Sequence, residues 1–109
     1  RFKVIFLNEA EEFLNDLDKK TRKKVLYNIW KSRSILDKEL FKKIDNEIWE
    51  FRTLFSRNYI RFFAFWDKSG KEDIVVITTH GIIKKTGKTP KKEIEKAERI
   101  REGYFKNKK

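Results

Sequence analysis

Residues 48–67, IWEFRTLFSRNYIRFFAFWD, carry the strongest structural signal in the chain. Apolar and aromatic side chains alternate with others on both sides of the short polar stretch SRN, residues 56–58. Alternation with a period of two is typical of β-strands, and a short polar segment between two such runs is typical of a hairpin turn. We therefore predict strands over residues 48–55 and 59–67, joined as an antiparallel hairpin.

The chain on either side of this hairpin supplies further strands. After it, DKSGKED (67–73) has the composition of a turn, and DIVVITTH (73–80) is apolar on both faces, as expected of a central strand. At the start of the chain, FKVIFL (2–7) is short and rich in β-formers, which favours a first strand over a signal peptide. We expect these segments to form a mostly antiparallel sheet.

Two helices are predicted between the first strand and the hairpin. Asn8 is the expected N-cap of the first helix, with Glu11 at the capping-box position, and this helix ends near Asp18. Apolar residues at helical spacing predict a second amphipathic helix from about Lys20 to Arg33. A short turn between them favours a helical hairpin that packs on the sheet.

The remaining segments are a connector and a last helix. Residues 34–46 are predicted as a polar connector with a short helical turn around Leu40 and Phe41. Thr89 is the expected N-cap of the last helix, and Pro90 stands at its first position.

The resulting order, β-α-α-β-β-β-α, is that of an α+β fold with an N-terminal helical hairpin and a C-terminal helix. With 109 residues, no repeat and no linker, we expect one domain over residues 1–109.

Charge and composition narrow the function. Lys and Arg number 28 against 17 Asp and Glu, a net charge of +11. Such an excess favours an anionic partner such as nucleic acid, the ribosome, an anionic membrane or an acidic protein, and the plainer explanation is solubility. Without Cys and with one His, we expect no disulfide framework, no metal site and no cofactor. We also expect a cytoplasmic protein without a membrane-spanning helix.

The predicted hairpin places a charged group on one face. Arg52 and Arg61 lie at similar distances from the turn, and Glu50 shares the phase of Arg52. Either that face is exposed or the three side chains pair with one another. RNA cleavage without metal can use such a set, because a base activates the 2′-OH while cations stabilise the charge on phosphorus. The alternative is a structural ion pair.

The stretch HGIIKKTGKTP, residues 80–90, adds a basic segment before a helix N-terminus, where anions are favoured. Its candidate nucleic-acid contacts are Lys84, Lys85 and Lys88. Tyr59 shares the phase of Arg61 and is a candidate for stacking on bases. For His80, the alternative to catalysis is a hydrogen-bonded structural role.

Residues 48–67, together with TTHGIIKKTGKTPKKEIEKAERIREGY (78–104), resemble the HigB-like, phage-related branch of the RelE/ParE toxin superfamily. The run from His80 to Ala97 is the most specific part, and the match covers nearly the whole chain. The resemblance implies a toxin of a type II toxin–antitoxin pair. Its relatives enter the ribosomal A site and cut mRNA through the 2′-OH without metal, and a cognate antitoxin neutralises them. The implied partners are the antitoxin, the ribosome and mRNA, with no membrane.

The resemblance also implies roles for individual residues. Arg52 and Arg61 match the basic positions borne on strands, and Lys84 and Lys85 match the basic residues after the last strand. Some relatives use a late His or Tyr to move a proton, but Tyr104 falls in the apolar stripe of the last helix. The candidates for proton transfer are therefore Glu50, His80 and Lys84.

Two other functions fit the same residues. ParE-like members share the fold and poison DNA gyrase without cleaving RNA, and a nucleic-acid-binding module would bind without catalysis. ParE-like members largely lack the basic site residues, whereas Arg52, Arg61 and the Lys-rich segment are present here. The sequence therefore favours the ribonuclease, and a supercoiling assay tests the gyrase alternative.

Overall fold

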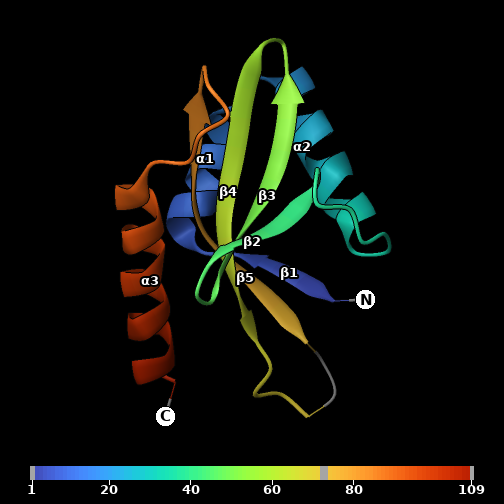
Figure 1. The fold of residues 1–109 in the computed structure, drawn as a ribbon. Helices are drawn as coiled ribbons and strands as arrows, with labels where there is room; N and C mark the ends of the chain where they lie inside the picture. The colour runs from blue at the N-terminus through green and yellow to red at the C-terminus, as the bar shows by residue number, and fades with distance from the viewer. Residues whose placement is uncertain (1, 72–73, 109) are drawn as a thin grey trace.

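A five-stranded sheet in the order β1-β5-β4-β3-β2 forms the centre of the structure (Figure 1). The computed structural model describes residues 2–71 and 74–108. The strands are β1 (Lys3–Phe6), β2 (Phe41–Asp45), β3 (Ile48–Phe55), β4 (Asn58–Asp67) and β5 (Val75–Lys84). β1 lies parallel to β5, and the other neighbouring strands are antiparallel. The predicted α+β fold with a mostly antiparallel sheet is therefore confirmed.

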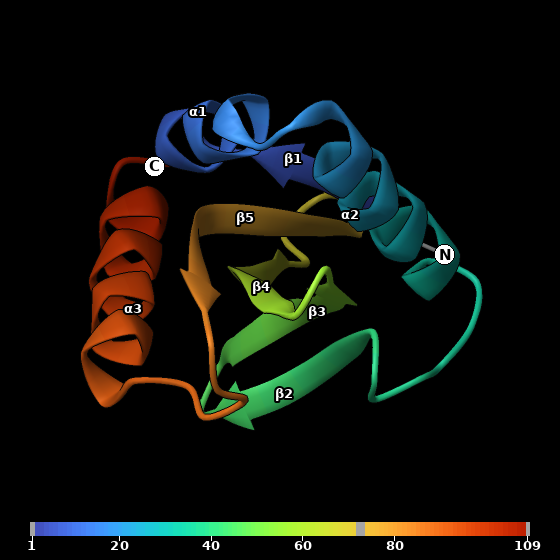
Figure 2. The same cartoon turned by 90° about the horizontal axis from the view of Figure 1, so that it is seen from above.

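Helices cover both faces of the sheet (Figure 2). The helical hairpin of α1 (Asn8–Asp16) and α2 (Lys19–Ser32) packs on one face, and α3 (Lys91–Lys106) packs on the other. The first core contains apolar side chains of α1 and α2 with Phe51, Ile60 and Phe62 of the sheet. The second core joins Ala97 of α3 to a smaller set of sheet residues, which we call the α3 face: Ile48, Phe63, Phe65 and Ile77.

The start of α1 differs from the prediction. Leu7, not Asn8, is the N-cap residue, and no side chain caps the helix. The backbone N–H of Leu7 donates to Thr78 O at 2.9 Å, which continues the pairing of β1 with β5 into this residue. Because sheet pairing already fixes the chain here, the helix begins directly after the strand without a polar cap. The helix also ends at Asp16, two residues before the predicted end.

A fifth strand was not expected. Residues 41–45, predicted as connector with a helical turn, form β2 at the edge of the sheet. The ring of Phe41 is buried and lies 4.3 Å from the ring of Phe51 and 4.8 Å from that of Trp49. Burial of this one aromatic ring attaches the segment to β3. The charged residues that follow it face solvent, and their composition is typical of a loop, so the sequence does not indicate a strand.

Strand β5 runs past its predicted end at His80 and contains a β-bulge. The residue pairs on either side of the irregularity are Phe63 with His80 and Ala64 with Thr78. Thr79 therefore has no partner of its own in β4, and the strand changes phase at this point. As a result His80 and Lys84 share the α3 face with Ile77. The predicted start of this strand, Asp73, and part of the predicted turn 67–73 lie outside the described residues.

Gly81 lies on the opposite face, against α1. A Cβ atom at this position would lie 2.6 Å from Cδ2 of Phe13 and 3.1 Å from Cε1 of Phe62. We expect Gly81→Ala to lower the free energy of unfolding by about 1–3 kcal/mol, because one ring must move in a packed core. Gly103→Ala is the control, since it meets nothing within 4 Å and improves helix propensity. Urea unfolding of both variants tests the prediction, and equal stabilities would contradict it.

Candidate functional site

The β3–β4 hairpin brings the predicted arginines together. Ser56 and Arg57 have φ values of 51° and 64°, the left-handed conformation that closes tight hairpins. The register that follows places Arg52 directly opposite Arg61. Alternation puts both side chains on the α3 face, as it does Glu50. Figure 1 shows the hairpin extending beyond the start of α3, so this end of the face is not covered by the helix.

One carboxylate holds both guanidinium groups. Oε1 of Glu50 lies 3.3 Å from Nε of Arg52 and 3.3 Å from Nε of Arg61. The other oxygen, Oε2, accepts a hydrogen bond from Oγ1 of Thr89 at 2.9 Å. The side chains of Glu50 and Arg61 are 3% exposed, whereas that of Arg52 is 22% exposed. The three side chains therefore pair with one another, as one alternative predicted, and Arg52 also remains partly exposed to solvent, as the other predicted.

The charges in this group are unequal. Two guanidinium groups share one carboxylate, and Lys84 adds a third cation, whose pKa is lowered by burial and by the nearby charge of Arg61. Burial lowers the pKa of Arg61, while the charge of Glu50 acts in the opposite direction. We call Arg52, Arg61 and Lys84, with Glu50 between them, the basic cluster. The cluster has three cationic side chains and one carboxylate. Because these side chains are largely shielded from solvent, the excess positive charge favours an anionic ligand.

All three cations of the cluster have a buried nitrogen without a hydrogen-bond partner among the described residues, Nε in Arg52 and Arg61 and Nζ in Lys84. The pKa of Lys84 is lowered, first by burial and then by the charge of Arg61. Its Nζ atom is buried and has no hydrogen-bond partner within the described part of the chain. The N–H groups of the Lys84 amine are therefore available as donors to a ligand that binds in the cluster.

Tyr59 and a small hollow complete the open side of the cluster. The Arg61 guanidinium lies over the Tyr59 ring, 5.2 Å from its centroid, and Lys84 is the strand partner of Tyr59. A hollow of about 90 Å³ is lined by Glu39, Arg52, Thr53, Leu54, Tyr59 and Arg61. An aromatic ring beside cations is an arrangement that can receive a nucleotide base and its phosphate.

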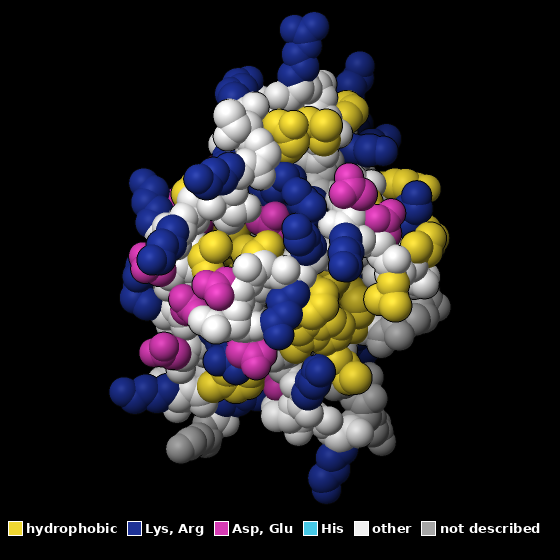
Figure 3. Space-filling view, viewed as in Figure 1, with side chains coloured by type: hydrophobic (Ala, Val, Ile, Leu, Met, Phe, Trp, Pro, Cys, Tyr) yellow, Lys and Arg dark blue, Asp and Glu magenta, His cyan; other side chains and the backbone are white. Residues whose placement is uncertain are grey.

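The loop after β5 presents the other predicted basic residues. Lys85 and Lys88 are exposed, and Nζ of Lys85 donates to Oδ1 of Asn58 at 2.7 Å. Figure 3 shows Lys and Arg side chains projecting around the upper end of the molecule, where this loop and the hairpin lie in Figure 1. These lysines are therefore placed to extend the positive surface next to the basic cluster.

His80 lies on the same face but behind the open end. Its side chain is buried and stacks on Phe63, with ring centroids 4.8 Å apart. Nε2 lies 3.1 Å from Oε1 of Glu93, and Nδ1 lies 2.8 Å from Oγ1 of Thr79. A neutral ring with its proton on Nε2 donates to Glu93, and its Nδ1 competes with the carbonyl oxygen of Phe63, 3.3 Å from Oγ1, for the single hydroxyl proton of Thr79. The structure does not bring His80 into the open cluster.

Burial gives His80 a measurable role in stability. It lowers the pKa of the ring below its usual 6.5, with the hydrogen bond to Glu93 acting in the opposite direction. Below about pH 6.5 the unfolded chain therefore binds a proton that the folded chain does not, so the free energy of unfolding falls as the pH decreases, and the contribution is complete above 6.5. Urea unfolding at about pH 7.5 and 5.5 measures this slope. We expect a steeper loss for the native chain than for His80→Gln; identical slopes would contradict the assignment.

Thr89 is the member of this site that the sequence missed. It was predicted as the N-cap of the last helix, but Pro90 occupies that position and α3 begins at Lys91. The Thr89 hydroxyl instead donates to Glu50, 39 residues earlier in the chain. A Thr before Pro has the same local pattern in both roles, so no sequence signal distinguishes them.

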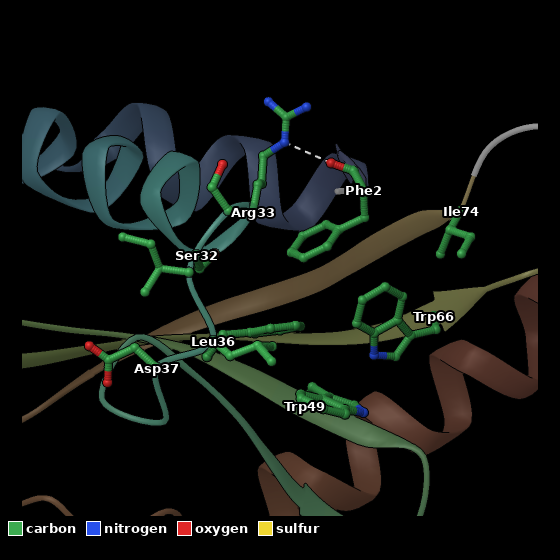
Figure 4. A pocket seen from close by; sticks show the side chains of 11 residues that line it. Phe2, Ser32, Arg33, Leu36, Asp37, Trp49, Trp66 and Ile74 are labelled. Carbon is green, nitrogen blue, oxygen red and sulfur yellow. Dashed lines mark hydrogen bonds between the residues drawn. The ribbon is translucent and has the colours of Figure 1, made fainter.

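A second hollow differs in chemistry. It has a volume of about 350 Å³ and shares no lining residue with the hollow at the basic cluster. Figure 4 shows its aromatic walls from Phe2, Trp49 and Trp66, with Nε of Arg33 donating to Phe2 O at 2.7 Å at its rim. Aromatic rings and aliphatic chains dominate its surface, and Arg33 is the only cation among its lining residues, so it offers a phosphate less positive charge than the basic cluster does. The basic cluster is therefore the candidate functional site.

The described residues offer neither a metal-ligand cluster nor a membrane-spanning helix. Within residues 2–71 and 74–108, no group of three or more His, Cys, Asp or Glu side chains could hold a metal ion. None of the helices in these ranges has the length and hydropathy needed to cross a membrane.

Comparison with known proteins places the chain in a family. No curated protein sequence matches it. The family model described as "Phage derived protein Gp49-like (DUF891)" matches residues 12–102, a span that runs from α1 to the second half of α3 and includes every residue of the basic cluster. The chain therefore belongs to the Gp49-like family of phage-derived proteins.

Proposed function

We propose that this protein is the toxin of a type II toxin–antitoxin pair and that it cleaves mRNA on the ribosome without a metal ion. The observation that carries the proposal is the pairing of Arg52 and Arg61 around one buried carboxylate at the open end of the sheet. Membership of the phage-derived Gp49-like family and the resemblance to RelE-like toxins support the same function. The HigB-like assignment is part of the proposal.

In this proposal the arginines bind the scissile phosphate. The 2′-OH of the preceding nucleotide loses its proton to a base and attacks phosphorus, the bond to the 5′-oxygen breaks, and that oxygen takes a proton from water, so that a 2′,3′-cyclic phosphate and a 5′-OH form. Negative charge grows on the phosphate oxygens during the attack, and fixed guanidinium groups stabilise it without reorganisation. Glu50 forms an ion pair with each arginine and so fixes the positions of both guanidinium groups.

Proton transfer is assigned to Lys84. Its lowered pKa increases the neutral fraction that can accept a proton from the 2′-OH, and Nζ has no competing hydrogen bond among the described residues. Glu50 is a weaker candidate because both of its oxygens are engaged. His80 is a weaker candidate because both ring nitrogens have partners.

Lys84 then sets the pH dependence of cleavage. We expect the rate to rise with pH up to the lowered pKa of Lys84, because only the neutral amine accepts a proton. Lys84→Arg keeps the positive charge but cannot lose its proton, so it should cleave at least about 100-fold more slowly and lose this rise. Single-turnover rates over a pH series measure both effects. A variant with the native pH profile would exclude Lys84 as the base.

Binding to the ribosome and mRNA uses the surrounding surface. Lys85 and Lys88 contact the RNA backbone, and Tyr59 stacks on a base next to the cleaved bond. The net charge of +11 supports attraction to ribosomal RNA, and this term weakens as salt increases. A cognate antitoxin with an acidic surface would neutralise the protein by covering the basic cluster, and a purified toxin–antitoxin complex that still cleaves would contradict this mode of inhibition.

The direct test is primer extension on a reporter mRNA in a purified translation system, with and without ribosomes. Cuts that require ribosomes are the expected result. Cuts on free RNA would indicate a ribonuclease that does not need the ribosome. Absence of cuts together with unaffected translation would contradict the proposal, and a DNA gyrase supercoiling assay would then test the function of the ParE-like members.

A further inference from the structure

The loop between β5 and α3 contacts the basic cluster at two points. Thr89 donates its hydroxyl proton to Oε2 of Glu50 at 2.9 Å, and the carbonyl oxygen of Gly87 lies 3.5 Å from Nη2 of Arg61. Both contacts come from the segment between β5 and α3, whereas the arginines come from the β3–β4 hairpin. The cluster is therefore complete only when the loop is in place.

The Thr89 contact decides how the Glu50 carboxylate is turned. A carboxylate rotates easily about its last side-chain torsion, which has a broad and roughly two-fold profile. Here Oε2 is occupied by Thr89, so Oε1 is the oxygen that faces both arginines at 3.3 Å. Glu50 is 2% exposed, and solvent has little access to replace a lost hydroxyl donor. Without that donor, the carboxylate is free to turn and pair with one arginine at the expense of the other.

The backbone around Thr89 is itself fixed. Pro90 has φ −66° and ψ 134°, and a residue before proline is restricted to extended conformations. Glu93, in the first turn of α3, bonds both to Pro90 O through its backbone N–H and to His80 through its side chain. Contacts with α3 thus fix the end of the loop, and this fixed backbone positions the Thr89 hydroxyl against Glu50.

We propose that Thr89 is a positioning residue, whose hydroxyl sets the orientation of the Glu50 carboxylate and thereby the arrangement of Arg52 and Arg61. The loop after β5 then has a second role besides presenting lysines: its docked position completes the anion site. The consequence for cleavage rests on the proposed function, whereas the consequence for the geometry of the two arginines does not.

Two variants remove the hydroxyl and one retains it. Thr89→Val keeps the shape of the side chain, Thr89→Ala removes its bulk as well, and Thr89→Ser keeps the hydroxyl. Thr86→Val is the matched control, because Thr86 is an exposed residue of the same loop. All are made in the full chain, and circular dichroism confirms that each is folded. Because two hydroxyl-free variants are compared, a packing effect of one replacement cannot be mistaken for the loss of the bond.

The first readout is spectroscopic and independent of activity. The Nε–H groups of Arg52 and Arg61 give resolvable nitrogen–proton NMR signals, which report on their contacts with Glu50. We expect both signals to move in Thr89→Val and Thr89→Ala and to stay at their native positions in Thr89→Ser and Thr86→Val. Unchanged arginine signals in the hydroxyl-free variants would overturn the proposal, as would a Thr89→Ser variant that behaves like Thr89→Val.

The second readout separates binding from chemistry. The probe is a single-stranded RNA with 2′-O-methyl groups, which binds but cannot be cleaved. We expect its affinity to change by less than about three-fold, because the cations that attract it remain. Ribosome-dependent kcat should fall by about 100-fold in Thr89→Val, as is typical when reacting groups are displaced, and should be restored in Thr89→Ser. Native kcat in Thr89→Val would overturn the role in cleavage. Arginine signals that move as expected, in a protein that never cleaves RNA, would instead refute the proposed function and leave the positioning role standing.

Discussion

We expect Glu50→Gln to lower the free energy of unfolding by about 3–5 kcal/mol, a large part of the stability of a small protein. Arg61 is 3% exposed and depends on this carboxylate for its opposite charge. In the variant, Arg52, Arg61 and Lys84 remain close together with no acid between them, so the cost combines lost attraction with unrelieved repulsion. The amide has the same shape as the acid, so packing does not change.

Urea unfolding at neutral pH measures this effect. Glu47→Gln is the matched control, because Glu47 is exposed in the turn between β2 and β3 and should change stability by less than about 0.5 kcal/mol. The double variant Glu50→Gln, Arg61→Gln should recover much of the loss, since it removes the buried charge that lacks a partner. A loss below about 1 kcal/mol in the single variant would mean that the cluster is solvated and that the ion pairs contribute little.

Arg61→Ala is expected to have the largest effect on activity. Under the proposed function, it removes a fixed guanidinium group from the cleaved phosphate, which should lower ribosome-dependent cleavage by about 10²–10³-fold. The variant should still fold, because Glu50 keeps Arg52 as a partner. Arg61→Ala should therefore have a higher free energy of unfolding than Glu50→Gln. Its low cleavage rate would then not result from unfolding.

Two further variants sharpen this test. Arg61→Lys keeps the charge but not the planar fork, so we expect an intermediate rate. Arg57→Ala, in the exposed hairpin turn, removes one positive charge from the same hairpin and should cleave at nearly the native rate. Quantified primer extension measures all three. If Arg57→Ala and Arg61→Ala reduced cleavage equally, general charge and not the cluster would explain activity.

The hairpin and the shared face of its arginines could be predicted from the sequence, but the exact register could not. Alternation defines which residues share a face, whereas the sequence indicates a turn of three residues, 56–58; the observed two-residue turn, with Asn58 already in β4, places Arg52 opposite Arg61. The same reasoning placed Glu50 beside them. What it could not give is the degree of burial, because an exposed face and a mutually paired group produce the same pattern. The structure combines the two at one site.

Other features escaped because their causes lie outside the local sequence. β2 is a strand because Phe41 packs on aromatic rings of β3, while its charged neighbours match a loop. The function of the Thr89 hydroxyl depends on a residue two strands away. The bulge at Thr79 falls in a run that is apolar on both faces, so a change of phase leaves no trace in the hydrophobic pattern.

That bulge makes the site tolerant of a change in the length of β5 at one position. Deletion of Thr79 would restore regular pairing and leave His80 opposite Phe63 and Lys84 opposite Tyr59, so that Lys84 would stay on the α3 face. Regular pairing with Thr79 retained would instead turn every later residue of the strand over, so that Lys84 would point towards the helical hairpin and Gly81 towards α3. Among related chains we therefore expect a chain that lacks the bulge to lack one residue at this point, and the number of residues from His80 to Lys84 to be conserved.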